Sequence, residues 1–261
     1  MAIHKIILNC QNSKLSRKIS QLAVRNQCQV TVCDHPPKPI PVGVSLVHIL
    51  ATDDFEQLIA QFSNTKPNCF YALESKNPSE WLDLKLALER FISVGANFRG
   101  VKKSGELIKS KADISSNLTA LAKELQNVTA YVGFADNILT VADELLMNAW
   151  RATKSGSRRG VDLVYGVKKS YFELTVRDHS GSLKKSVINR HLQRCLDPNR
   201  KRILQSKTGA GVGVFIVMTM SHQVSIAVRR ARMTEITCRF KICKRVLESE
   251  LAFRAFSFQM V

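Results

Sequence analysis

Long apolar runs and a secretory leader are both missing from this 261-residue sequence. No apolar segment approaches the roughly 20 residues that cross a bilayer, and the segment GVGVFIVMTM is too short. The N-terminal segment MAIHKIILNCQN has no apolar stretch of the length that a secretory signal needs. These absences predict a cytoplasmic protein without membrane insertion.

Paired cysteines are also missing. None of the seven cysteines forms a CxxC motif, and no histidine or further pair of cysteines stands at the spacing of a zinc site. We interpret them as reduced thiols, in keeping with a cytoplasmic location.

Acidic residues are few: 21 Asp and Glu stand against 39 Lys and Arg, for a formal net charge of +18. A field of this sign attracts nucleotides, nucleic acid, acidic proteins or anionic membrane surfaces. The charge by itself does not choose among them.

Residues 1–103 alternate short apolar strands with helical stretches, which predicts a parallel α/β sheet covered on both faces. We expect strands at residues 4–9 and 28–33 and in the runs VSLVHIL and NCFYAL, and helices at 13–26, in DFEQLIAQF and in PSEWLDLKLALERFISV. This order resembles the receiver domain of two-component signalling. The first strand ends in LNCQN without an acidic pair, and Asp53 and Asp54 fit a helix N-cap and first turn. We therefore expect a receiver-like domain without phosphoryl acceptance, used for dimerisation or partner docking.

A second domain is expected over residues 104–261. It begins with an amphipathic helix at 105–130, and a further helix follows from Asp136, a plausible N-cap. In that second helix Glu144, Asn148 and Arg151 are four and three residues apart, so they share one face. Such a face could hold a water, a metal ion and a phosphate, or it could be an ordinary solvated surface.

Two further segments are candidate ligand sites. The predicted strand YFELTVRD ends at Asp178, which is followed by small residues that would let a ligand approach, although a simple turn is the alternative. The segment from Lys207 and Thr208 through Gly209, Gly211 and Gly213 opens an apolar helix, where backbone amides can bind phosphate. It fits neither the Walker A nor the dinucleotide pattern. A predicted hairpin at 222–230 and 233–242 follows.

Together these segments resemble the GHKL family of ATP-binding proteins (gyrase, heat-shock chaperone, histidine kinase, MutL) over roughly residues 110–245. Glu144 to Asn148 matches the N box, and Gly209 to Val214 matches the second glycine box. Asp178 to Leu183 matches the first glycine box in part, with two serines in place of glycines. Within the family the chain is most similar to bacterial anti-sigma-factor serine kinases. The C-terminal RAFSFQMV looks like their final strand.

The resemblance implies a Bergerat-type α/β sandwich, a mixed sheet with helices on one face, that binds ATP and Mg²⁺. It implies that Asn148 coordinates Mg²⁺ and that Glu144 acts as general base or orients the attacking group. Asp178 would bind the adenine amino group, with Gly181 making room for the ring. The phosphate contacts would come from Arg151, Lys207, Thr208, Gly209, Gly211 and Gly213.

The segment between the glycine boxes would be an ATP lid. It is rich in Lys and Arg, and it is either a mobile solvated loop or a surface for an acidic partner.

Three functions remain open. The first is a kinase that phosphorylates a serine of a separate regulatory protein; self-phosphorylation on a preceding histidine is disfavoured because no histidine lies between His48 and His179. The second is an ATP-responsive binding module with little turnover that docks an acidic protein or nucleic acid. A gyrase-like clamp is the least favoured, because no transducer domain follows.

Overall fold

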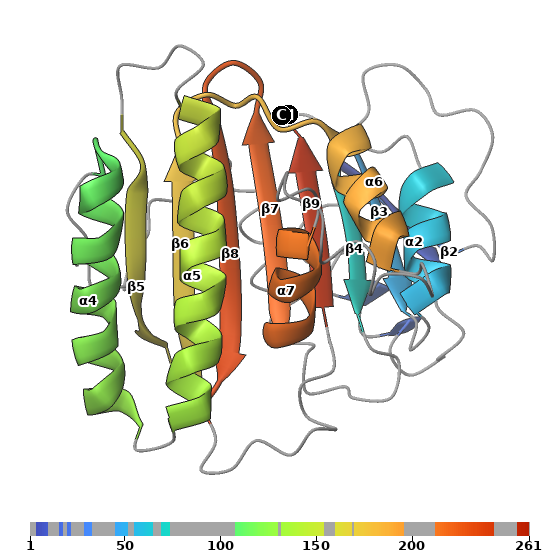
Figure 1. Cartoon of the computed structure of the whole chain (residues 1–261). Helices are drawn as coiled ribbons and strands as arrows, with labels where there is room; N and C mark the ends of the chain where they lie inside the picture. Colours follow the sequence, from blue (N-terminus) through green and yellow to red (C-terminus); the bar gives the residue numbers. More distant parts are fainter. Residues whose placement is uncertain are drawn as a thin grey trace. The chain divides into compact units, whose positions relative to one another are not determined.

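The computed structural model in Figure 1 is a mixed α/β structure that divides into two compact units. Unit 1 comprises Met1–Arg99 with Arg254–Met260, and unit 2 comprises Gly100–Phe253. The structure describes residues 4–9, 16–17, 20–21, 29–32, 45–51, 55–64, 69–73, 108–129, 132–153, 160–168, 170–195, 212–242 and 255–260.

Unit 1 contains four strands that pair in parallel in the order β2-β1-β3-β4. The strands are β1 (His4–Asn9), β2 (Gln29–Val32), β3 (Ser45–Ala51) and β4 (Cys69–Leu73), and α2 spans Phe55–Asn64. The four strands and α2 confirm the elements expected there. The helix expected in PSEWLDLKLALERFISV, and most of the helix expected at 13–26, lie outside the described residues. The receiver likeness stays a prediction.

The C-terminal strand β9 (Ala255–Met260) belongs to unit 1, which corrects the expectation that residues up to 261 belong with the second domain. It pairs antiparallel with β4, and Tyr71 lies opposite Ser257. The ring of Phe62 on α2 packs edge-on against Phe256 and Phe258, with centroids 5.3 and 5.5 Å apart. This aromatic packing and the β4 ladder explain why the strand joins unit 1.

Unit 2 is built on a four-stranded antiparallel sheet in the order β7-β8-β6-β5. Its strands are β5 (Asp162–Lys168), β6 (Tyr171–Asp178), β7 (Gln223–Arg229) and β8 (Met233–Lys241). Strands β6, β7 and β8 were expected from the sequence. Its helices are α4 (Lys111–Val128), α5 (Val132–Thr153), α6 (Lys185–Cys195) and α7 (Val212–Met220).

Helices α4, α5 and α7 lie on one side of this sheet (Figure 1). The core forms where the apolar stripe of α5 meets apolar rows of β6 and β8. It includes Ile138, Val141, Leu145, Phe172, Leu174, Val176, Cys238 and Phe240, each less than 5% exposed.

The two long helices begin at different places from those expected. Helix α4 starts after Ser110, which caps it: Ser110 Oγ accepts from Asp113 N–H, and the Asp113 carboxylate accepts from the N–H groups of Lys109 and Ser110. Hydrogen bonds to the carboxylate lower the pKa of the Asp113 carboxyl, and the bond from the Lys109 backbone N–H has the largest effect. Helix α5 starts at Val132, so Asp136 lies inside it and the N-cap expectation was wrong.

No helix within the described ranges is long and apolar enough to cross a membrane.

Candidate functional site

Three elements of unit 2 bring their chemistry to the same end of the sheet. A short connection joins α5 to β5, and β5 begins opposite the end of β6, where Asp162 pairs with Arg177. Helix α7 leads almost directly into β7, whose far end lies beside the start of β8. The C-terminal part of α5, the N-terminus of α7 and Asp178 at the end of β6 therefore meet at this end of the sheet, which is called the site edge.

The polar face predicted on α5 is present. Asn148 Nδ2 donates to Glu144 Oε1 at 3.4 Å, and Arg151 donates to Asn148 Oδ1 at 3.4 Å. Both bonds are long and hence weak. Asn148 and Arg151 are exposed and Glu144 is half-buried, so the row can exchange these contacts for a ligand at small cost.

Gly213 at the start of α7 packs directly against this row. A Cβ added there would overlap the Glu144 carboxylate, lying 2.5 Å from its Cδ and closer still to Oε1. Helices α5 and α7 are in contact along this seam. The last glycine of the glycine-rich motif and the carboxylate of the N-box-like segment are thus immediate neighbours.

Asp178 is buried at the end of β6, and one side of its carboxylate is held by the loop that follows. Its Oδ1 accepts from Ser180 N–H at 2.8 Å, Ser180 Oγ at 2.5 Å and Gly181 N–H at 3.3 Å. Ser182 bonds in turn to Ser180 Oγ. Ser180 and Ser182 therefore orient this carboxylate. Among the described residues none donates to Oδ2, which leaves that oxygen for a ligand.

Gly181 is required by its backbone. Its φ is +58°, and a Cβ there would lie 2.7 Å from the backbone nitrogens of Arg232 and Met233 and would overlap Arg229 O. Ala231 N–H also donates to Gly181 O at 3.3 Å. The glycine therefore lets the loop after Asp178 pack on the turn between β7 and β8. Its role in making room for a ring stays a prediction.

Thr234 is a site residue that the sequence analysis missed. It lies opposite Asp178 in the β6–β8 ladder, is 3% exposed, and its buried hydroxyl has no hydrogen-bond partner within the described residues. A buried hydroxyl without a partner costs about 1–3 kcal/mol, so it is a natural contact for a ligand. The sequence indicates Thr234 only as a polar residue that begins a row of alternate positions, which continues with the apolar residues Ile236, Cys238 and Phe240.

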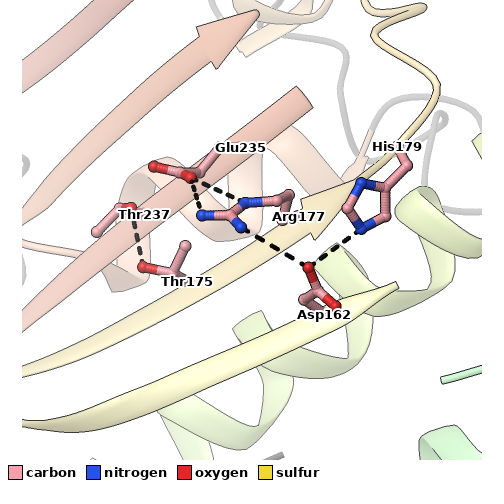
Figure 2. Close-up of polar contacts among 6 residues, drawn as sticks. All are labelled: Asp162, Thr175, Arg177, His179, Glu235 and Thr237. Carbon is pink, nitrogen blue, oxygen red and sulfur yellow. Dashed lines mark hydrogen bonds and ion pairs between the residues drawn. The ribbon is translucent and has the colours of Figure 1, made fainter. Parts of the chain in front are cut away.

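The opposite face of the same strands carries a cross-strand polar network, drawn in Figure 2. Arg177 donates twice to Glu235 Oε2, at 2.9 and 3.1 Å, and lies 3.8 Å from Asp162 Oδ2. His179 Nε2 lies 3.1 Å from the same Asp162 oxygen. One row deeper, the hydroxyls of Thr175 and Thr237 are 2.9 Å apart.

Positive charge gathers beside the site. The basic cluster consists of Lys184, Arg229, Arg230 and Arg232: Lys184 follows the loop at Gly181, Arg229 ends β7, and the other two arginines belong to the turn that packs on the loop. Lys184, Arg230 and Arg232 are exposed. At the start of α6, burial lowers the pKa of Lys185 to about 8. Part of the segment expected to be a lid is thus helical, anchored by buried Ile188 and Leu192.

Six of the ten predicted site residues lie within the described part of the chain. Glu144, Asn148, Arg151, Asp178, Gly181 and Gly213 all belong to the elements that meet at the site edge. Lys207, Thr208, Gly209 and Gly211 lie outside the described residues.

The donor set fits a magnesium nucleotide. Mg²⁺ binds oxygen, takes one or two protein ligands and keeps several waters, so the amide oxygen of Asn148 is a suitable ligand. The described residues contain no group of three or more His, Cys, Asp or Glu that could hold a metal alone.

No protein-family model and no curated protein matches the chain. A chain in the crystal structure of the SiaB-SiaC complex from Pseudomonas aeruginosa is similar, with a TM-score of 0.43 and 14% identity over 62% of this chain and 99% of that chain. A likeness at this level establishes neither a family nor a shared activity.

Proposed function

We propose that unit 2 binds Mg·ATP at the edge of its sheet, and that the chain is a signalling kinase acting on a serine or threonine of a separate regulatory protein. The observation that carries the ATP proposal is the packing of Gly213 against Glu144. It joins two motifs that are far apart in the sequence and that both belong to the resemblance stated above.

The base end of the site would be formed by Asp178 and Thr234. A carboxylate oxygen accepts from an exocyclic amino group, while a hydroxyl can donate to a ring nitrogen or accept. The two residues are direct neighbours in the ladder and both are buried. An adenine would satisfy the Thr234 hydroxyl, whereas guanine presents an oxygen where Asp178 needs a donor.

The phosphate end would be formed by α5 and α7. The N-terminus of α7 carries partial positive charge and free N–H groups, which favour phosphate. Asn148 would hold Mg²⁺, Glu144 beside it would orient the attacking group, and Arg151 would contact phosphate oxygens. Bound Mg²⁺ neutralises charge that develops during phosphoryl transfer.

Calorimetric titration with Mg·ATP and Mg·ADP tests the site. We expect saturable binding by the wild-type chain and a loss of about tenfold or more in Asn148→Ala, since removing a bond to a charged ligand costs about 1.5–3 kcal/mol. Asn137→Ala is a matched control: the same substitution on the same face of α5, about three turns away. Equal affinity in both variants would remove Asn148 from the site.

The kinase part of the proposal has its own test. Glu144→Gln should keep nucleotide affinity within a fewfold but abolish phosphate release and transfer, if Glu144 orients the attacking group. Turnover by Glu144→Gln at the wild-type rate would contradict this role.

The basic cluster favours a second candidate, an ATP-responsive module that docks an acidic protein and turns over little ATP. Four cations belong to the loop that positions Asp178 or to the β7–β8 hairpin end whose backbone packs on it, which is more than the base end of a nucleotide needs. A docked acidic segment would therefore lie beside the nucleotide. We expect Arg230→Glu/Arg232→Glu to weaken binding of a polyglutamate peptide.

The matched control for this charge reversal is Lys111→Glu/Lys123→Glu, two exposed positions on α4 with the same change in net charge. Equal weakening in both double variants would mean that only net charge matters. Preferential binding of duplex DNA, with the steep salt dependence of phosphate contacts, would favour a nucleic acid over an acidic protein.

Unit 1 is proposed to dock a partner or a second copy of the chain. The order β2-β1-β3-β4 supports the receiver likeness, because it matches the first four strands of a doubly wound 2-1-3-4-5 sheet. Sedimentation of the full chain distinguishes a homodimer from a monomer that docks another protein.

A further inference from the structure

We propose that Asp162 and His179 form a positioning pair that fixes the direction of the Asp178 carboxylate. This inference rests on the proposed nucleotide site, where Asp178 would contact the base. Neither Asp162 nor His179 lies on the same face as that carboxylate, so both would act through the backbone.

Successive side chains of a strand point to opposite faces, so Asp178 and its neighbours Arg177 and His179 are on different sides. Asp178 continues the buried row of Phe172, Leu174 and Val176. Arg177 and His179 instead reach the network of Figure 2.

His179 stands just beyond the end of the strand ladder. The last β5–β6 pair is Asp162 with Arg177, and the last β6–β8 pair is Asp178 with Thr234. Past this point the backbone has no strand pairing to hold it. The contact of His179 Nε2 with Asp162 Oδ2, at 3.1 Å, ties the chain down one residue after Asp178.

Asp162 holds both neighbours of Asp178. The same Oδ2 that contacts His179 lies 3.8 Å from Arg177 Nη1, and Arg177 is further fixed by Glu235. The four side chains are 20–28% exposed, so solvent screens their interactions only in part.

The loop that grips Asp178 depends on this tie. Ser180 N–H and Gly181 N–H reach Asp178 Oδ1 only if the chain turns immediately after His179. If His179 moved away from β5, the backbone before these two amides would no longer be held in place. The carboxylate would then lose the bonds that leave Oδ2 facing a ligand.

Two readouts test the pair in the full-length chain. In Asp162→Ala and His179→Ala, we expect amide hydrogen exchange at Ser180 and Gly181 to become about tenfold faster and Mg·ATP affinity to fall about tenfold, as a lost contact worth about 1.4 kcal/mol gives. The double variant should resemble either single variant, because both remove one interaction. His179→Gln keeps an N–H donor at the ε position and should restore both readouts to within about threefold.

Thr237→Val is the matched control. It removes a hydrogen bond between β6 and β8 on the same face of β6, one row away from Arg177 (Figure 2). It should lower stability without changing exchange at Ser180 and Gly181 or nucleotide affinity at a temperature where the chain is folded.

If hydrogen exchange at Ser180 and Gly181 in both alanine variants is as slow as in the wild-type chain, the proposal of a positioning pair is overturned. An equal effect of Thr237→Val, or no rescue by His179→Gln, would also overturn it. The exchange readout needs no nucleotide, so it decides on the pair even if the wild-type chain binds no ATP. That latter result would instead reject the proposed function and, with it, the role of the pair in base recognition.

Discussion

The two faces of β6 are both buried near the middle of the strand, yet they are built from different chemistry. On one face Phe172, Leu174 and Val176 are at most 3% exposed and pack in an apolar core. On the other, Glu173 and Thr175 are 1–2% exposed and each has a polar partner on β8. Apolar packing is tolerant of direction, whereas each polar residue requires one specific partner.

The two rows of β6 contribute differently to the candidate site at the end of the strand. The apolar row ends in Asp178, and the polar row ends in His179. The residue that would meet a ligand therefore comes from the core side, while the groups that orient it come from the polar side. Substitutions on the two rows should have different signatures.

The largest effect is expected on the polar row. Arg239→Ala removes the guanidinium that bonds Glu173 Oε2 at 2.8 Å and Gln223 at 3.2 Å. Breaking a buried ion pair by removing one partner costs about 3–5 kcal/mol. Denaturant unfolding measures this loss, and a loss below about 1 kcal/mol would mean that water replaces the pair and that the polar row is not directional.

A conservative exchange on the apolar row gives the contrast. Leu174→Met keeps volume and should cost less than about 1.5 kcal/mol. Glu173→Gln keeps shape equally well but leaves the Arg239 charge without its counterion, so it should cost more. Equal losses in the same unfolding assay would erase the distinction between the rows.

The apolar row also predicts a response to pH. Burial raises the pKa of the Cys238 thiol to about 12. The unfolded thiol ionises from about pH 9, so the contribution of Cys238 to stability is full below that pH and is lost as pH rises toward 12. The free energy of unfolding of Cys238→Ala should therefore fall less steeply with pH over this window than that of the wild-type chain. An identical slope in both would contradict the burial of the thiol.

The smallest effect is expected where neither row is involved. Ala231 has φ +56° in the β7–β8 turn that packs on Gly181. Glycine relieves this left-handed strain but loses more entropy on folding, so Ala231→Gly should stabilise by only about 0.5 kcal/mol. Thermal unfolding measures the change, and a clear loss of stability would show that the alanine methyl group makes a needed contact.

Local sequence patterns predicted most described elements of unit 2 because alternation and helical periodicity are local properties. They placed β6 correctly up to Asp178, and they put Glu144, Asn148 and Arg151 on one face. They misplaced the start of α5, since VGFA before Asp136 contains nothing that prevents a helix from starting earlier.

Long-range pairing was harder to predict. Nothing near β9 in the sequence names β4 as its partner, so the strand was expected but assigned to the wrong unit. Thr234 was missed for the same reason, because only the register opposite Asp178 makes its hydroxyl part of the site. The pairing of Asp162 with His179 also depends on that register.

Hydrogen exchange of the full chain with and without saturating Mg·ATP tests the central claim, a nucleotide site at one edge of unit 2, most directly. We expect slower exchange at the C-terminal part of α5, in the loop after Asp178 and at the start of α7, with unit 1 unchanged. Saturable binding with protection confined to other segments, or no binding by a folded chain, would contradict the site.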